Sequence, residues 1–171
     1  MPTTRSIPSA TLAEIESAST TENILVFVTL DHDVLSEPIR VVSDPVNYVY
    51  GSNTYTGFQF DIEILTDDDR PPTARLSVQN VDREIGDALR KITSPMKVTL
   101  TIIAGSQFTQ SVDPRAEIGT ASTMYSATDL ELVDVEVTAM FVTGTLRLRD
   151  YSQEQWPSTM GTQDRLPGLF R

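Results

Sequence analysis

The sequence predicts a mainly β protein with one packed helix, built as a β-sandwich or open barrel with a short N-terminal helix and extended terminal arms. Thr, Ser and Val are abundant, several runs alternate apolar and polar residues, and one internal segment carries strong helix signals. A chain of 171 residues is long enough for one substantial core. We divide it into an arm with a short helix (1–22), a β domain (23–149) and an extended arm (150–171).

The first elements follow from a cap and a long apolar run. Thr11 precedes Glu14 by three residues, which is capping-box spacing and predicts that a short helix begins at Thr11. Residues 23–30 (NILVFVTL) form a nearly continuous apolar run, which predicts a buried central strand. Residues 39–43 are expected to be its partner strand.

Residues 47–57 carry the pattern of a β-hairpin. Tyr48, Tyr50 and Tyr55 flank the turn signal at residues 51–53. These tyrosines fit ordinary cross-strand packing at least as well as a sugar-stacking platform or an interface patch. Both interpretations stay open at this point.

Alternation predicts the remaining strands, at 59–65, 74–79 and 96–103, and two more within 130–149 that meet near residues 139–144. Residues 107–128 lack this pattern and are predicted to be a long loop or hairpin extension. The packed helix is expected at 82–92, capped by Asn80 or Asp82 and ended before Pro95. Its apolar stripe, which should pack onto the sheet, consists of Ile85, Ala88, Leu89 and Ile92.

The composition restricts the classes of partner. A formal net charge of −11 and the lack of basic runs argue against direct, sequence-specific nucleic-acid binding. No apolar stretch approaches the roughly 18–20 residues of a membrane span, and we expect no signal peptide and no membrane partner. The chain has no cysteine, so it can form neither disulfides nor thiolate metal sites.

Candidate catalytic groups have simpler explanations. Asp31-His32-Asp33 follows a predicted strand, but one His cannot build a zinc site and no Ser nucleophile motif accompanies it. A group of carboxylates on the later strands suits a solvent or interface face better than a glycosidase pair; it consists of Asp129, Glu131, Asp134 and Glu136. We therefore expect no enzyme activity, no cofactor and no metal.

Two segments are better suited to contacts with other proteins. Asp67, Asp68 and Asp69 precede Pro71 and Pro72 in an acidic, proline-stiffened loop, whose spacing is wrong for an EF-hand. The C-terminal arm holds the only Trp and ends in apolar residues that suit insertion into a neighbour's pocket. The arm residues predicted at an interface are Trp156, Pro167, Gly168, Leu169 and Phe170.

The central block and the C-terminus contain a set of separated elements, which in order are Pro38-Ile39-Arg40, residues 55–64, Asp67 to Asp69 with Pro71-Pro72, Asn80-Val81-Asp82-Arg83, Leu89-Arg90 and residues 167–170. Together they resemble a family of minor tail (tail-tip) proteins of long-tailed bacteriophages and prophages. The resemblance covers roughly residues 24–104 and the tail, with Thr66 where the family usually has proline and no counterpart for 107–128.

The resemblance implies a tail-tube-like fold and a structural role in the virion tail. The expected form is a homomeric ring, of six subunits or alternatively three, joining the tail tube to the hub near the tape-measure protein. DNA would pass through an acidic lumen without sticking. The alternative is a host-recognition or carbohydrate-binding β-sandwich module, which should cluster exposed aromatic side chains on one face.

Overall fold

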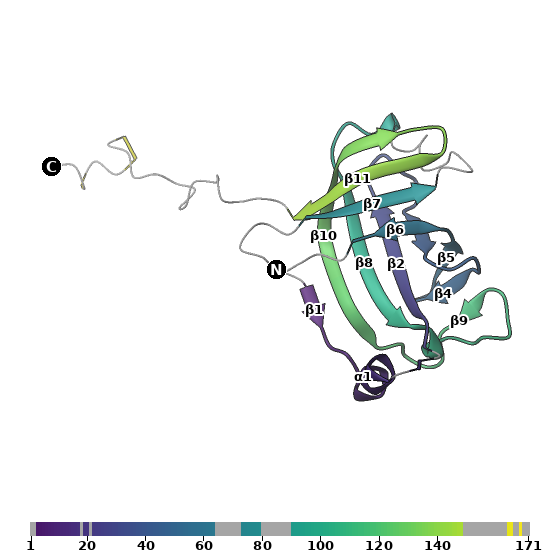
Figure 1. The fold of residues 1–171 in the computed structure, drawn as a ribbon. Coiled ribbons are helices and arrows are strands. Elements are labelled where there is room, and N and C mark those ends of the chain that lie inside the picture. Colours follow the sequence, from purple (N-terminus) through teal and green to yellow (C-terminus); the bar gives the residue numbers. More distant parts are fainter. Residues whose placement is uncertain are drawn as a thin grey trace.

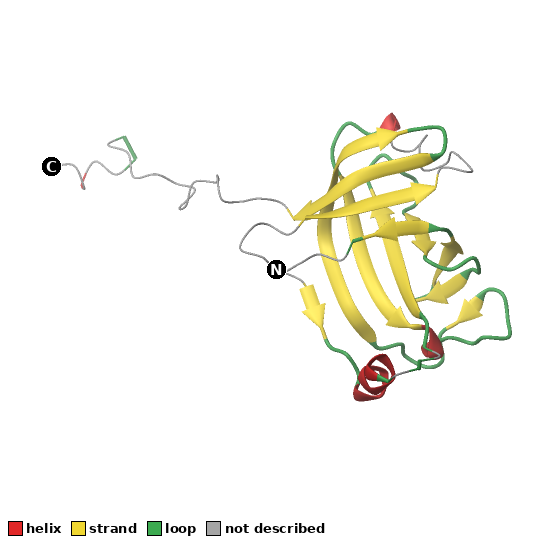
Figure 2. Ribbon diagram, in the orientation of Figure 1, coloured by secondary structure: helices red, strands yellow, loops and turns green. Residues whose placement is uncertain are grey.

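A computed structural model describes residues 3–17, 19–20, 22–63, 73–79 and 90–148, together with residues 164, 165 and 168. The described part is mostly β, with one sheet curled into a half-barrel and very little helix (Figures 1 and 2). This confirms the predicted class of a mainly β open barrel. The acidic loop at 67–72 lies outside the described residues.

The strands in chain order are β1 (Thr3–Arg5), β2 (Ile24–Asp31), β3 (Ile39–Val42), β4 (Tyr48–Tyr50), β5 (Asn53–Gly57), β6 (Phe60–Ile62), β7 (Thr73–Gln79), β8 (Met96–Ala104), β9 (Arg115–Ala116), β10 (Thr123–Val137) and β11 (Phe141–Leu148). Helix α1 (Ser9–Glu16) follows β1, and a 3₁₀ turn, η1 (Gly105–Gln107), follows β8. Across the sheet the order is β6-β7-β11-β10-β8-β2-β3-β5-β4-β9, and β1 pairs with the start of β10.

Strand β2 is buried on both faces, which explains its nearly continuous apolar run. Val28 and Leu30 belong to the large core inside the half-barrel. Leu25 and Phe27 belong to a second, smaller core beneath the β4–β5 hairpin. Fully burying such a side chain contributes about 1.5–3 kcal/mol to stability. Because the two faces of β2 belong to different cores, this strand packs against both of them. The predicted central strand and its antiparallel pairing with β3 are both confirmed.

The predicted hairpin is formed by β4 and β5. Gly51 and Ser52 have φ of +55° and +66°, the left-handed values of a two-residue turn that matches strand twist. Tyr48 lies opposite Tyr55, and both rings meet Phe27 edge-on at centroid distances of 5.9 and 5.0 Å. Both tyrosines are buried, so they serve cross-strand packing and present no sugar-stacking face.

The sequence predicts a long loop or hairpin extension at 107–128, and a loop throughout is wrong, because β9 lies within that range and β10 begins at Thr123, from where it extends the antiparallel pair with β8. Three register shifts each place an extra residue in β10, between Thr123 and Tyr125, between Ala127 and Leu130, and between Val133 and Glu136. Such bulges interrupt the period-two alternation that identifies a strand in sequence. The strand pair predicted within 130–149 is confirmed.

The N-terminal helix begins at Ser9, so the predicted cap at Thr11 is wrong. The Leu12 amide donates to the Pro8 carbonyl at 2.9 Å, and Thr11 is a buried residue inside the helix. Before the helix, β1 adds antiparallel to β10. The first residues of the predicted arm thus take part in the sheet.

Only the end of the packed helix predicted at 82–92 falls within the described residues. Arg90 and Lys91 are helical, and residues 82–89 lie outside the described part. Ile92 follows directly and packs half-buried against the large core. This end of the segment therefore lies against the half-barrel, as the apolar stripe predicts.

Candidate assembly surfaces

The half-barrel has an open edge at β6. Among the described strands β6 pairs only with β7, so no described strand lies along its other side. Phe60 and Ile62 are half-buried against the large core, whereas Asp61 is exposed. The strand therefore covers the core with one face while presenting a free backbone edge.

The hydrogen bonds of β6 show which backbone groups are free. The Gln79 amide donates to the Gln59 carbonyl and the Glu63 amide donates to the Arg75 carbonyl, at 3.5 and 3.1 Å. Paired residues in an antiparallel ladder alternate between bonding across the pair and pointing away from it. Phe60 and Ile62 lie between the bonded positions, so their N–H and C=O groups point away from β7.

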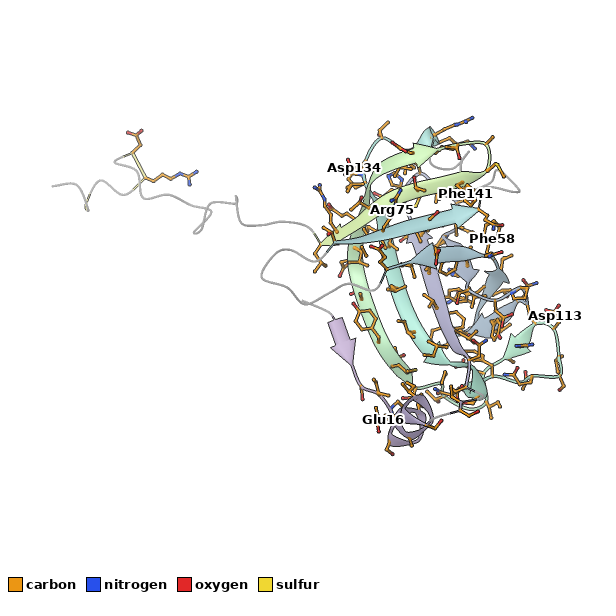
Figure 3. The ribbon with its side chains drawn as sticks, in the orientation of Figure 1. Glu16, Phe58, Arg75, Asp113, Asp134 and Phe141 are labelled. Carbon is orange, nitrogen blue, oxygen red and sulfur yellow. The ribbon has the colours of Figure 1, made fainter. Side chains whose placement is uncertain are left out.

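A cavity of about 500 Å³ lies beside this edge, where the end of β5 runs into β6. We call it the seam cavity. Its lining combines apolar and polar side chains with one carboxylate, and consists of Ser43, Asp44, Pro45, Thr56, Gly57, Phe58, Gln59, Phe60 and Gln79. Figure 3 labels Phe58 in this region. A Cβ on Gly57 would lie 2.6 Å from backbone atoms of Asp44 and Pro45, so the cavity wall requires glycine there.

A polar network joins the β4–β5 hairpin to the loop that carries β9. The Tyr48 hydroxyl donates to Asp44 at 2.9 Å and accepts from Arg115 Nη1 at 2.7 Å. Arg115 and Asp44 also approach to 3.6 Å, which ties the loop bearing β9 to the hairpin. Burial, followed by the Asp44 hydrogen bond, raises the pKa of the Tyr48 phenol, while Arg115 opposes the shift. The network therefore has a structural role, in which the two opposite charges and the Tyr48 hydroxyl bind one another.

His32 is part of a loop and has no catalytic geometry. Its Nδ1 accepts the Val34 amide at 3.1 Å, so in the neutral ring the proton is on Nε2. Nε2 then donates to the Ser94 hydroxyl at 2.8 Å. The ring is buried while Asp31 and Asp33 are exposed, so the three side chains do not converge on one site. Nδ1 therefore bonds within the loop, and Nε2 bonds the loop to the segment before β8.

The carboxylates of β10 lie mostly at the surface, which agrees with the solvent or interface face predicted for them. Asp129, Asp134 and Glu136 are exposed and Glu131 is half-buried. Asp134 and Glu136 share a shallow groove with Arg75 of β7, and Figure 3 labels Arg75 and Asp134 there. No group of three or more metal-ligating side chains occurs within the described residues.

Exposed apolar side chains add two further surfaces. Leu12 and Ile15, three positions apart on α1, are 41% and 43% exposed. Met140 and Phe141, at the turn between β10 and β11, are 70% and 42% exposed, and Figure 3 labels Phe141. Apolar side chains exposed in this way are typical of surfaces that contact other proteins.

Most of the interface residues predicted from sequence lie outside the described part of the chain. These are Asp67, Asp68, Asp69, Pro71, Pro72, Trp156, Pro167, Leu169 and Phe170. Gly168 is described and exposed, and a Cβ built on it would meet nothing within 4 Å. The free edge of β6 and the seam cavity were missed by sequence reasoning, because alternation identifies a strand but not its place in the sheet.

The fold and these surfaces define a class of protein: an open β half-barrel whose strand β6 pairs, within the described residues, only with β7. Its sequence matches the family model described as a domain of unknown function (DUF1833) over residues 10–160, and the chain belongs to that family. Comparison with curated proteins finds no match. No helix within the described ranges is both long enough and apolar enough to cross a membrane.

Proposed function

We propose that this chain is a structural protein of a long-tailed phage virion, which forms a homomeric ring at the distal tail between tube and hub. The observation that carries the proposal is the outer edge of β6, a strand that among the described strands pairs only with β7. A free strand edge is a template for pairing with another chain. Repeated head-to-tail contacts of this kind close into a ring when the rotation permits.

Three further observations support a contact function. The segment that resembles minor tail proteins spans the chain from β2 to β8, which includes the edge strand β6. His32, which otherwise invites a catalytic interpretation, is used in structural hydrogen bonds. The exposed apolar side chains of α1 and of the β10–β11 turn offer additional contact area.

The charge of the chain suits a channel for DNA. The net charge is −11, and exposed carboxylates include Asp61 and Glu63 beside the seam and Asp134 on β10. A ring with an acidic lumen would repel the phosphate backbone and let DNA pass without binding. We propose six subunits, with three as the alternative, and tube, tape-measure and hub proteins as neighbours.

The test is size-exclusion chromatography with light scattering, followed by negative-stain electron microscopy of the peak. The proposal predicts rings with a central hole. A chain that stays monomeric, alone and when mixed with tube and hub proteins from the same tail, would refute the ring. The carbohydrate-binding alternative would then be tested with a glycan array, although Tyr48 and Tyr55 are buried and offer it no platform.

A further inference from the structure

We propose that residues 168–171 of one copy add as a short strand to the free edge of β6 in the next copy, with one apolar side chain entering the seam cavity. This inference rests on the proposed ring and names the contact that closes it. It requires three kinds of match, in backbone hydrogen bonding, in side-chain chemistry and in charge. The described residues supply the receiving side of each match.

The backbone match comes from β6. Phe60 and Ile62 each turn an N–H and a C=O away from β7. An added strand pairs with such groups through every second residue, so Gly168 with Phe170, or Leu169 with Arg171, is sufficient. Pro167 has no N–H to donate, which sets the start of the added strand after it.

The side-chain match comes from the seam cavity. Its volume of about 500 Å³ exceeds that of one Leu or Phe side chain, and its walls include Pro45, Phe58 and Phe60. Leu169 and Phe170 are consecutive, so in an extended strand they point to opposite faces. One of them enters the seam cavity, while the other lies on the outer surface of β6.

The charge match favours this segment over others in the chain. The edge strand and its continuation expose Asp61 and Glu63. In a chain with a net charge of −11, most segments would be repelled by that edge. The charged side chains of residues 164–171 are Asp164, Arg165 and Arg171, so the net side-chain charge of this segment has the opposite sign.

The C-terminal arm is long enough to reach a seam cavity. The last strand, β11, ends beside Thr73 at the start of β7, whereas the seam cavity adjoins Gln79 at its other end. Residues 149–168 can span up to about 70 Å when extended, well beyond the roughly 20 Å length of β7. In the isolated chain Gly168 is exposed and contacts nothing through a built Cβ, so it is not seated in its own cavity.

A thiol cross-linking experiment tests the contact in the full chain, which has no native cysteine. One protein carries Gln59→Cys in the cavity wall and a second carries Gly168→Cys in the arm. A short bis-maleimide is added to the mixture, and dimers are counted on a denaturing gel. The matched control replaces Gln59→Cys by Ser111→Cys, which is equally an exposed position but lies in the loop between η1 and β9.

We expect the Gln59→Cys and Gly168→Cys mixture to give at least tenfold more dimer than the Ser111→Cys control. Equal yields would overturn the proposal. So would a chain carrying both cysteines that links only within itself, because the arm would then bind its own edge. Electron microscopy of the same samples separates the two claims. Rings without the specific cross-link refute this contact alone, whereas the cross-link with only open chains or dimers refutes the ring.

Discussion

The two sides of the half-barrel differ in how completely they are closed. On the hairpin side, β4, β5 and the β9 loop cover β2 with buried aromatic rings and a polar network. On the side of the seam cavity, β6 pairs with only one of the described strands, and the backbone groups of two of its residues point away from that strand. The hairpin side has the features of a folding unit, and the side of β6 is the one where we propose that a neighbouring copy binds. Mutations on the two sides should therefore have different consequences.

The largest effect is expected at Phe27, whose ring contacts Tyr48, Tyr50, Tyr55 and Phe108. Phe27→Ala should lower the free energy of unfolding by about 3–5 kcal/mol, because it leaves a cavity in a close-packed aromatic cluster. Urea denaturation measures the change. The matched control is Phe58→Ala at the half-buried seam, where a smaller loss is expected. Equal losses would contradict the distinction between the two sides.

Gly57→Ala should have the next largest effect. Its Cβ would lie 2.6 Å from backbone atoms of Asp44 and Pro45, which cannot move as a side chain can. We expect a loss of about 1–3 kcal/mol in the free energy of unfolding. Gly168→Ala is the control, because its Cβ meets nothing within 4 Å, and it should change stability by less than about 0.5 kcal/mol. A Gly57→Ala protein as stable as this control would contradict the prediction, because the backbone of Asp44 and Pro45 would then have moved to make room for the Cβ.

Tyr48→Phe removes a hydroxyl that serves both Asp44 and Arg115. The expected loss is about 1–3 kcal/mol near neutral pH, because two partly buried charged groups lose a partner. The pKa of Tyr48 is raised in the folded state, so its contribution is complete below the ordinary tyrosine value of about 10 and declines as the pH rises above it. Denaturation curves from pH 8 to 11 should show the gap between wild type and Tyr48→Phe narrowing. A gap that widens would contradict the direction of the shift.

The smallest effect on folding is expected at Ile62 of β6, where loss of the N–H should affect assembly most. Ile62→Pro removes an N–H that points away from β7, at an edge position where proline is tolerated. Ile62→Ala loses the same side chain but keeps the N–H. Their free energies of unfolding should differ by less than about 1 kcal/mol, whereas only Ile62→Pro should lose rings in electron microscopy. If both variants assemble equally, the edge of β6 is not the contact.

The sequence predicts those elements whose burial follows a simple period. The two-faced run of β2, the alternation of β7 and β8 and the turn at Gly51 and Ser52 all appear where expected. The first part of β10 does not, since its bulges displace the apolar residues from alternate positions. Thr11 fails as a cap because the backbone already becomes helical at Ser9.

The candidate contact could be predicted only in part. The apolar character of Leu169 and Phe170 is visible in the sequence and identifies a segment suited to burial. The place that receives it is formed by residues from β3, β5, β6 and β7, which meet only in the fold. Which strand has a free edge depends on sheet order, a long-range property that local periodicity does not encode.

Amide hydrogen exchange tests the central claim most directly, because it reads both sides of the half-barrel in one experiment. Exchange is compared between assembled rings and subunits dissociated by dilution. We predict that the amides of Phe60 and Ile62 become strongly protected in the ring, while those of Tyr48, Tyr50 and Tyr55 keep the same rates. Unchanged exchange at Phe60 and Ile62 in assembled rings would contradict assembly through the open edge of β6.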